Sequence, residues 1–351
     1  MTTTTLNRAA WLRGPKATPL EIGPAPMPTP HGTEVVVQVH SVALNPADAA
    51  IQKLGVVLEA DHYPYILGFD IAGVITAVGP DNKRFQPGDR VTALGIAYAL
   101  KDTRYSAFQH YAVVDEPVLA KIPDSLSFND ACVLGAGLST AADALFNRNA
   151  MALDFPKPGG NKPNGKILLV WGGASSVGAC AIQAAKAAGY TIAATASARN
   201  FDLLREIGAE YVFDYASATV IEDIVDALKD KVEMAGIFCA IIDPAVLAQC
   251  ATISGRLGGK KHVGTVRPPG FPPLENWPQE IEISECNCCD VAKNEVGPAV
   301  WGSWLEAALA DGSMKCRPRC EVVGKGLEGL QGALDLMFKG VSAKKLVVEI
   351  I

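Results

Sequence analysis

The chain has 351 residues, which suggests about two domains, and 49% of them are hydrophobic, enough for sizeable cores. A formal net charge of −6 without any Lys/Arg-rich run argues against nucleic acid as a partner. No apolar run approaches the roughly 18 residues of a membrane span, and the N-terminus lacks a signal pattern. We therefore expect a cytoplasmic protein whose nine cysteines are reduced thiols.

The N-terminal part is predicted to be mostly β-structure. Residues 1–7 are expected to be disordered, and six prolines between residues 15 and 30 permit only an edge strand or a loop there. Strands are predicted at 34–42, 64–72, 73–79 and 107–114. Short strands separated by Gly/Pro turns are typical of a compact, barrel-like domain.

A short helix is predicted after the strand 34–42. Asn45 is a suitable N-cap, and Pro46 occupies the first helical position, followed by Ala47 and Asp48. Asp48 is expected to brace this helix start rather than to act as a base.

From Ser127 to Phe146 the pattern becomes helical, and after a Pro/Gly-rich linker strands and helices alternate. The predicted strands are 167–171, 191–195, 211–213, 235–242 and 261–266. This alternation indicates an α/β fold with a doubly wound parallel sheet. The tail is predicted to contain helix 300–310, strand 320–323, helix 327–338 and strand 345–350.

The turn after the strand 167–171 is built from small residues. It contains Gly172, Gly173, Ala174, Ser175, Ser176 and Val177, and a helix follows. A strand, a small-residue turn and a helix aim backbone N–H groups at a phosphate, which predicts a dinucleotide site. The full G-x-G-x-x-G fingerprint is absent, and tight packing alone would produce a similar pattern.

The end of the next strand indicates which dinucleotide binds. An NAD site needs an acidic residue there, whereas this chain has Ser197, Arg199 and Asn200 and no acidic residue before Asp202. Hydroxyl, guanidinium and amide groups are donors for a 2′-phosphate, so we predict NADP(H). Alternatively, these residues cap the helix that starts near Phe201, a role compatible with phosphate binding.

These motifs resemble the medium-chain dehydrogenase/reductase superfamily across nearly the whole chain. The resemblance is carried by residues 45–48, 68–74 with 78–79, 87–91 and 172–178. It implies a GroES-like β-barrel domain over residues 1–140, completed by about 295–351, and a Rossmann domain over 141–294.

Within this superfamily, zinc-dependent alcohol dehydrogenases carry Cys at the position of Asn45 and Gly-His-Glu at residues 68–70. Neither Asn45 nor Phe69 offers a thiolate or imidazole ligand, so we expect no zinc. The pair Cys286 and Cys288 has metal-binding spacing, but ordinary thiols are the favoured interpretation.

Among zinc-free members, the chain resembles the fungal trans-acting enoyl reductases of polyketide synthases, of which the lovastatin-pathway type is best known. The matching segments are 137–141, 197 with 200–203, 208–210, 212–215 and 344–348. The resemblance implies that Ser197, Arg199 and Tyr215 hold the 2′-phosphate. It implies further cofactor contacts by Asn45, Pro46, Ala47, Asp48, Val263, Ala343 and Lys344. It places Gly135, Leu138, Thr140 and Cys288 beside the substrate, and Phe271 of the loop 267–279 is a further substrate candidate from the sequence.

Some of these assignments have ordinary structural alternatives. Tyr215 could be an aromatic at the edge of a core, and Thr140 a helix hydroxyl bonded to its own backbone. The loop 267–279, with Phe271 and Trp277, could wall an apolar tunnel or simply be a Pro-rich surface loop.

The implied activity is NADPH-dependent hydride transfer to an α,β-unsaturated thioester or enone, carried on a polyketide synthase acyl carrier protein or free. Candidate donors to the carbonyl oxygen are Asn45 and Thr140. Relatives carry a Lys or Tyr where this chain has Ala49–Ile51, so Lys53, His62, Tyr63 or water must supply the proton. The alternatives are a quinone or 2-alkenal reductase, an NADPH-binding protein with little turnover, and a zinc alcohol dehydrogenase. Relatives occur as monomers and homodimers.

Overall fold

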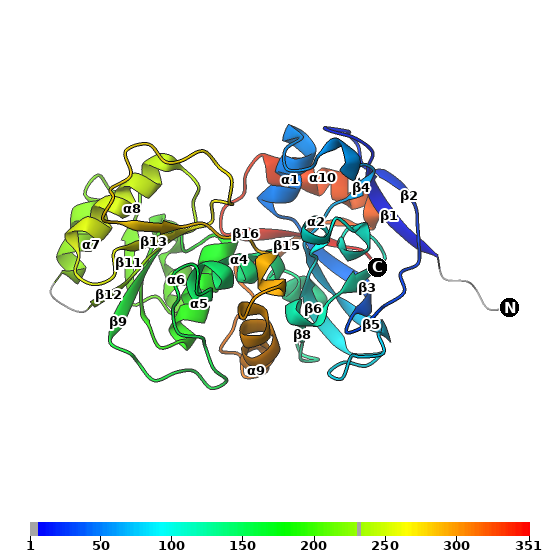
Figure 1. Ribbon diagram of the computed structural model, residues 1–351, viewed down its shortest axis with the longest axis horizontal. Coiled ribbons are helices and arrows are strands. Elements are labelled where there is room, and N and C mark those ends of the chain that lie inside the picture. The colour runs from blue at the N-terminus through cyan, green and yellow to red at the C-terminus, as the bar shows by residue number, and fades with distance from the viewer. Residues whose placement is uncertain (1–5, 230–232) are drawn as a thin grey trace. The chain divides into compact units, whose positions relative to one another are not determined.

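The structure, a computed structural model, describes residues 6–229 and 233–351 (Figure 1). The disorder predicted for residues 1–5 therefore lies outside the described residues. The chain divides into two compact units, which we call the first unit (residues up to 136 and from 319 onwards) and the second unit (137–318). The sequence-based division at 140 and about 295 differs from this one, because residues 295–318 group with the second unit.

The first unit consists mainly of antiparallel strands. Its elements are β1 (Asn7–Leu12), β2 (Glu21–Ala25), β3 (Val35–Ala43), α1 (Pro46–Leu54), β4 (Tyr65–Ile66), β5 (Asp70–Val78), β6 (Arg90–Leu94), α2 (Ala97–Leu100), β7 (Tyr111–Val114), β8 (Leu119–Lys121), α3 (Phe128–Ala131), β15 (Arg319–Lys325), α10 (Leu330–Phe338) and β16 (Lys344–Glu349). One sheet has the order β15-β16-β3-β5-β6-β8, with β7 also paired to β3, and a small sheet has the order β2-β1-β4.

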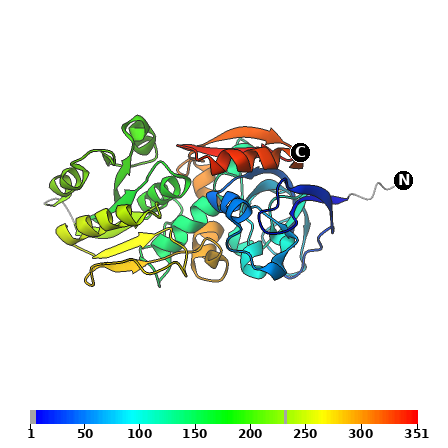
Figure 2. The same cartoon turned by 90° about the horizontal axis from the view of Figure 1, so that it is seen from above.

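The chain's last strand, β16, lies between β15 and β3 in the larger sheet. β16 pairs with β15 on one side and with β3 on the other, and α10 packs along β15 and β16 (Figure 2). The C-terminal segment thus contributes its side chains directly beside the residues that end β3. This pairing is what brings Lys345 and Asn45 together, as described below.

Several strand predictions need correction. Asn7 is buried in β1, so the predicted disorder is wrong for this residue. The predicted strands 64–72 and 73–79 are instead the two-residue β4 and a continuous β5. The break falls at Gly68, whose φ of +102° favours glycine, and a Cβ there would lie 2.4 Å from the ring of Phe108. The proline-rich segment contains the edge strand β2, as predicted.

The second unit alternates strands and helices. Its elements are α4 (Gly135–Phe146, which crosses the boundary), β9 (Lys166–Trp171), α5 (Ser176–Ala187), β10 (Thr191–Ala196), α6 (Phe201–Glu206), β11 (Tyr211–Asp214), α7 (Val220–Leu228), β12 (Glu233–Cys239), α8 (Pro244–Arg256), β13 (His262–Thr265), β14 (Glu282–Ser284), a π-helix (Pro298–Leu305) and α9 (Glu306–Ala310). The sheet order is β11-β10-β9-β12-β13-β14 and every neighbouring pair is parallel. This is the doubly wound order of a Rossmann fold, which confirms the predicted fold class.

The central strand β9 is buried on both faces, as its unbroken apolar run predicted. Ile167, Leu169 and Trp171 belong to the core formed with α7 and α8. The intervening Leu168 and Val170 are also completely buried. Packing on both faces therefore fixes the position of β9, and this supports the loop at its carboxyl end.

The sequence did not predict β14, which has only three residues and follows the Pro-rich loop. It is held in place by the completely buried His262 of β13, whose Nε2 lies 2.8 Å from Ser284 Oγ. Such a contact between distant residues leaves no periodic signal in the sequence. The predicted helix 300–310 is present, although its first part is the π-helix.

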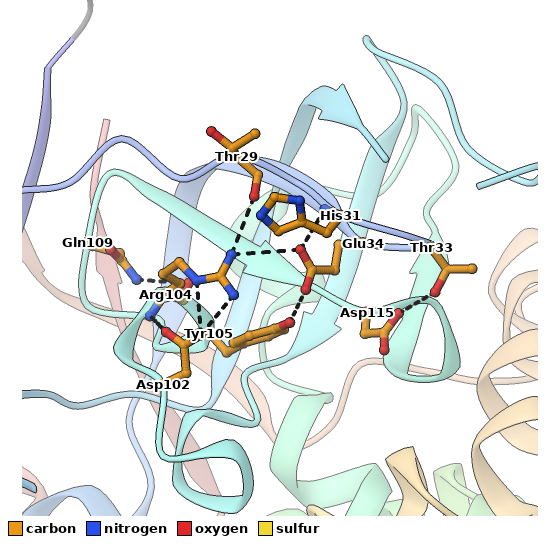
Figure 3. Close-up of polar contacts among 9 residues, drawn as sticks. All are labelled: Thr29, His31, Thr33, Glu34, Asp102, Arg104, Tyr105, Gln109 and Asp115. Carbon is orange, nitrogen blue, oxygen red and sulfur yellow. Dashed lines mark hydrogen bonds and ion pairs between the residues drawn. The ribbon is translucent and has the colours of Figure 1, made fainter. Parts of the chain in front are cut away.

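A polar network in the first unit joins the segment before β3 to the loop 102–109 (Figure 3). Arg104 donates from Nε to Asp102 Oδ2 at 2.9 Å and pairs with Glu34 at 3.8 Å, while the Tyr105 hydroxyl donates to Glu34. Arg104 also donates to the carbonyl of Thr29 at 3.3 Å. We call Asp102, Arg104, Tyr105 and Glu34 the Arg104 network. Its contacts connect the segment before β3 to the loop 102–109, which is a structural role.

Candidate functional site

The turn between β9 and α5 has the geometry of an anion-binding loop. Ser175 is the N-cap of α5, and its Oγ accepts from Gly178 N at 3.0 Å and donates to Gly172 O at 2.8 Å. The first-turn N–H groups of this 12-residue helix have no acceptor one turn earlier. Together with the helix dipole, these groups favour a phosphate at this end.

The glycines of this loop are required by close packing. A Cβ on Gly178 would lie 2.3 Å from Gly172 O, and Gly172 itself has a φ of +83°. Thr195 at the end of β10 secures the loop, since its carbonyl and hydroxyl accept from Gly173 N at 2.8 Å and Gly172 N at 3.1 Å. This geometry brings backbone near the ligand position, as a pyrophosphate requires. The residues therefore fit a dinucleotide.

The predicted 2′-phosphate residues follow the carboxyl ends of two adjacent strands. Ala196 of β10 and Asp214 of β11 are paired in register, so Ser197 and Tyr215 each come one residue after the same edge. Arg199 and Tyr215 are exposed, and Asn200 Nδ2 donates to Ser197 Oγ at 3.1 Å. The Ser197 side chain does not cap the short helical turn that follows it. The structure thus gathers hydroxyl, amide and guanidinium groups at one edge.

The other predicted residues of the second unit have varied surroundings. Val263 and Leu138 are completely buried, whereas Thr140 and Cys288 are half-buried. Phe271 is 48% exposed and lies beneath the guanidinium of Arg267 at 5.5 Å. The cofactor and substrate contacts assigned to these residues stay predictions.

The first unit contains a buried charged cluster at the start of α1. Lys345 Nζ donates to Asn45 Oδ1 at 2.6 Å and lies 2.8 Å from Asp70 Oδ2. Asp70 Oδ1 accepts from Ala136 N at 2.5 Å. The Asp70 side chain is fully buried and that of Lys345 is 3% exposed. We call Asn45, Asp70 and Lys345 the Lys345 cluster.

One polar group of the Lys345 cluster lacks a partner. Asn45 is 7% exposed, yet its Nδ2 has no hydrogen-bond acceptor anywhere in the described ranges 6–229 and 233–351. A buried amide donor without an acceptor is rare and costs free energy unless a ligand satisfies it. A bound molecule with an acceptor atom would satisfy this amide.

Asp48 braces the start of α1, as predicted. Its Oδ2 accepts from Asn45 N at 2.9 Å and its Oδ1 from Gly68 N at 3.0 Å. Burial raises the pKa of this carboxyl to about 7, although both N–H donors lower it. Pro46 begins the helix beside it, so Asp48 fixes the position of Asn45.

The three candidate proton donors differ in their hydrogen-bond and ion-pair partners. Lys53 pairs with Asp335, and His62 Nδ1 accepts from Glu59 N at 3.0 Å. The buried Tyr63 hydroxyl has no hydrogen-bond partner among the described residues, and desolvation raises its pKa. Tyr63 thus offers a buried hydroxyl proton that no described residue accepts.

The residues at the zinc positions of the dehydrogenase relatives do not fit zinc. Asn45 supplies an amide, Phe69 a hydrocarbon ring, and Asp70 is already paired with the ammonium of Lys345. In the part of the chain that the structure describes, the segment from Cys286 to Cys289 assembles no group of three metal-ligating side chains. No step of the reaction is therefore assigned to a metal.

The sequence singled out Lys344, but its neighbour Lys345 has the more informative position. Lys344 is exposed and pairs with Glu321 at 2.5 Å, whereas Lys345 points to the interior. Alternation along β16 places the side chains of residues 344 and 345 on opposite faces, but it does not show which of the two is buried. Ala343, which precedes them, has a φ of +53°.

Comparison with known proteins assigns the chain to a family. Residues 31–124 match the alcohol dehydrogenase GroES-like domain, and residues 176–300 match the family described as zinc-binding dehydrogenase. A zinc-binding alcohol dehydrogenase domain-containing protein, cipB of Emericella nidulans, is 37% identical over 98% of each chain. The chain belongs to the medium-chain dehydrogenase/reductase superfamily.

Further similarities narrow the group within this superfamily. The trans-enoyl reductase himH of Aspergillus japonicus is 37% identical, again over 98% of each chain. The crystal structure of the CurK enoyl reductase has the same fold, with a TM-score of 0.76 at 20% identity over 98% of this chain and 99% of that one. The resemblance predicted from the sequence is confirmed, and the chain is an oxidoreductase of this superfamily with a nucleotide-binding fold. In the described ranges, no helix has the length and apolarity needed to cross a membrane.

Proposed function

We propose that the chain reduces the carbon–carbon double bond of an α,β-unsaturated thioester or carbonyl with NADPH, acting in trans on a polyketide synthase. The observation that carries this proposal is the full-length similarity to a trans-enoyl reductase, together with residues at the zinc positions that suit no metal. NADPH supplies hydride to the β-carbon when it is bound.

The phosphate-binding groups support NADPH over NADH. The first loop offers helix N–H groups to the pyrophosphate, and Ser197, Arg199 and Tyr215 follow the same edge of the sheet. A guanidinium binds phosphate in bidentate fashion, whereas no carboxylate lies at the end of β10 to bond a ribose hydroxyl.

The chain's own residues must stabilise the carbonyl oxygen as negative charge develops there. The amide of Asn45 and the hydroxyl of Thr140 are the proposed donors, since hydrogen bonds aimed at a developing oxyanion lower the barrier. The α-carbon then takes a proton from water or from Tyr63. Asp48 holds the backbone of Asn45 by accepting from Asn45 N.

Cofactor selectivity tests the first half of the proposal. We expect dissociation constants measured by nucleotide fluorescence to favour NADPH, and Arg199→Ala to reduce that preference by about 10-fold or more, as loss of a charged hydrogen bond implies. Arg205→Ala is the matched control, since Arg205 in α6 pairs with Asp202 on the surface. A wild-type preference for NADH would refute this half.

Acceptor selectivity tests the second half. Initial rates of NADPH oxidation should be higher with crotonyl thioester than with free quinones or alkenals. Faster turnover of quinones would favour a quinone or 2-alkenal reductase, and NADPH binding without oxidation would favour a binding protein. A polyketide synthase gene beside this one would support the proposed partner.

A further inference from the structure

We infer that Lys345 is a positioning residue: its buried ammonium orients the Asn45 amide so that Nδ2 donates to an oxygen of the bound substrate or cofactor. This inference rests on the proposed function, in which Asn45 is a donor at the site. It adds a residue that acts entirely through Asn45.

The orientation follows from the chemistry of the two groups. An ammonium has three donors and no acceptor, so only the oxygen of the amide can face it. The observed contact joins Lys345 Nζ to Asn45 Oδ1 at 2.6 Å. Because the oxygen is committed, Nδ2 must point away from Lys345. Without the ammonium, the amide could rotate by half a turn and present its oxygen, which cannot stabilise negative charge.

Lys345 is itself held in place by the residues around it. Asp70 Oδ2 lies 2.8 Å from Nζ, and its second oxygen accepts from Ala136 N at 2.5 Å. A Cβ on Gly135 would lie 2.5 Å from that oxygen, so glycine is needed for the carboxylate to occupy its position. The position of the ammonium is therefore fixed by Asp70, and its hydrogen bond to Oδ1 fixes the orientation of the Asn45 amide.

The unpartnered Nδ2 defines the ligand as an oxygen acceptor. A carbonyl oxygen of the enoyl group fits, and so does an amide or hydroxyl oxygen of the nicotinamide half of the cofactor. Asn45 is 7% exposed, so water gives little compensation when the site is empty. The Asn45 Nδ2 donor is thus suited to bind a ligand atom rather than solvent.

A double-mutant cycle between Asn45 and Lys345 tests the inference. Hydride transfer is measured in single turnovers with NADPH and crotonyl thioester, and NADPH affinity is measured by fluorescence. We expect Asn45→Ala to slow transfer about 100-fold, the effect of removing one oxyanion donor. Lys345→Met should slow it by about 10-fold or more, yet change nothing further in the Asn45→Ala background. Additive losses would overturn the inference, because they would mean that Lys345 acts independently of Asn45.

Companion variants separate orientation from folding. Asp70→Asn combined with Lys345→Met removes the buried charges together and keeps an acceptor for Ala136 N, so the pair is used if Lys345→Met alone unfolds. Asn45→Asp retains an acceptor for Lys345 but has no donor when ionised, and should be as slow as Asn45→Ala. Lys325→Met, at an exposed pair on β15, should have wild-type rates.

The two measurements distinguish the source of the oxygen. A cofactor oxygen predicts weaker NADPH binding in both single variants, whereas a substrate oxygen predicts slower transfer at unchanged NADPH affinity. If none of the enoyl acceptors tested supports NADPH oxidation by the wild type, the proposed function fails. The cycle is then measured on NADPH affinity alone, where additive losses or no loss would overturn the inference.

Discussion

The Lys345 cluster and the Arg104 network are both polar groups of the first unit, yet they differ in how completely they are satisfied. Around Arg104, the charged side chains remain partly exposed, with 34% exposure for Arg104 and 32% for Asp102. Tyr105 and Glu34 satisfy each other there. In the Lys345 cluster, the two charges are buried almost completely, and one amide donor has no partner among the described residues.

This difference separates structure from function. A half-exposed network connects loops and tolerates change, because water replaces whatever contact is lost. A buried cluster does not tolerate the loss of one member, since the remaining charge is left without compensation. An unsatisfied donor in such a cluster has a cost that a ligand can offset, which is why we propose the Lys345 cluster, and not the Arg104 network, as part of the site.

Removal of Asp70 should have the largest effect on stability. In Asp70→Ala the Lys345 ammonium loses its counter-ion and Ala136 N its acceptor, so we expect a loss of about 3–5 kcal/mol in the free energy of unfolding. Urea denaturation measures this loss in the free energy of unfolding. Asp70→Asn, which keeps the acceptor, should lose less; a negligible loss in both variants would show that the charge pair is unimportant.

A methyl group beside Asp70 should have the next largest effect. Gly135→Ala places a Cβ 2.5 Å from Asp70 Oδ1 and 3.0 Å from Ala93 O, and we expect a loss of about 1–3 kcal/mol, as for other overpacked sites. Gly332→Ala in α10 is the control, because its Cβ meets nothing within 4 Å and should stabilise the helix by about 0.5–1 kcal/mol. Thermal unfolding would report both, and a stable Gly135→Ala would contradict the close packing.

The pH dependence of stability should reveal Asp48. Its pKa is raised to about 7 when folded, so between its unfolded pKa near 4 and pH 7 the folded state binds more protons than the unfolded state. Stability from this group is therefore present below about pH 4 and falls as pH rises to 7, by at most about 1.4 kcal/mol per pH unit. Urea titrations should show the wild type losing stability relative to Asp48→Asn over this window. A constant difference would contradict the raised pKa.

Changes in the Arg104 network should have the smallest effect. Arg104→Met removes a guanidinium that is 34% exposed from its pairs with Glu34 and Asp102, and should cost about 1 kcal/mol. Hydride-transfer rates should equal those of the wild type, because no member of the network is assigned to the site. A slow Arg104→Met enzyme would remove the distinction between the two clusters.

The sequence predicted the strands, helices and phosphate loop whose signals are local. The apolar run of β9 and the small residues after it correspond to what the structure contains, and so does Asp48 as a brace. The fold class followed from the alternation of strands and helices.

Features that depend on distant contacts were not predictable. The strand β14 depends on His262, and the Lys345 cluster joins residues 300 positions apart in the chain. Pairing of β16 with β3 creates this cluster, and a single sequence does not contain that information. The sequence therefore predicted Asn45 as a donor, but it did not predict the contact of Asn45 with Lys345.

The most direct test of the account is the rate of NADPH oxidation by crotonyl thioester, measured before and after exhaustive dialysis against a metal chelator. An internal ammonium at the zinc position predicts the same rate in both samples. Loss of the rate on dialysis, restored by added zinc, would contradict the account.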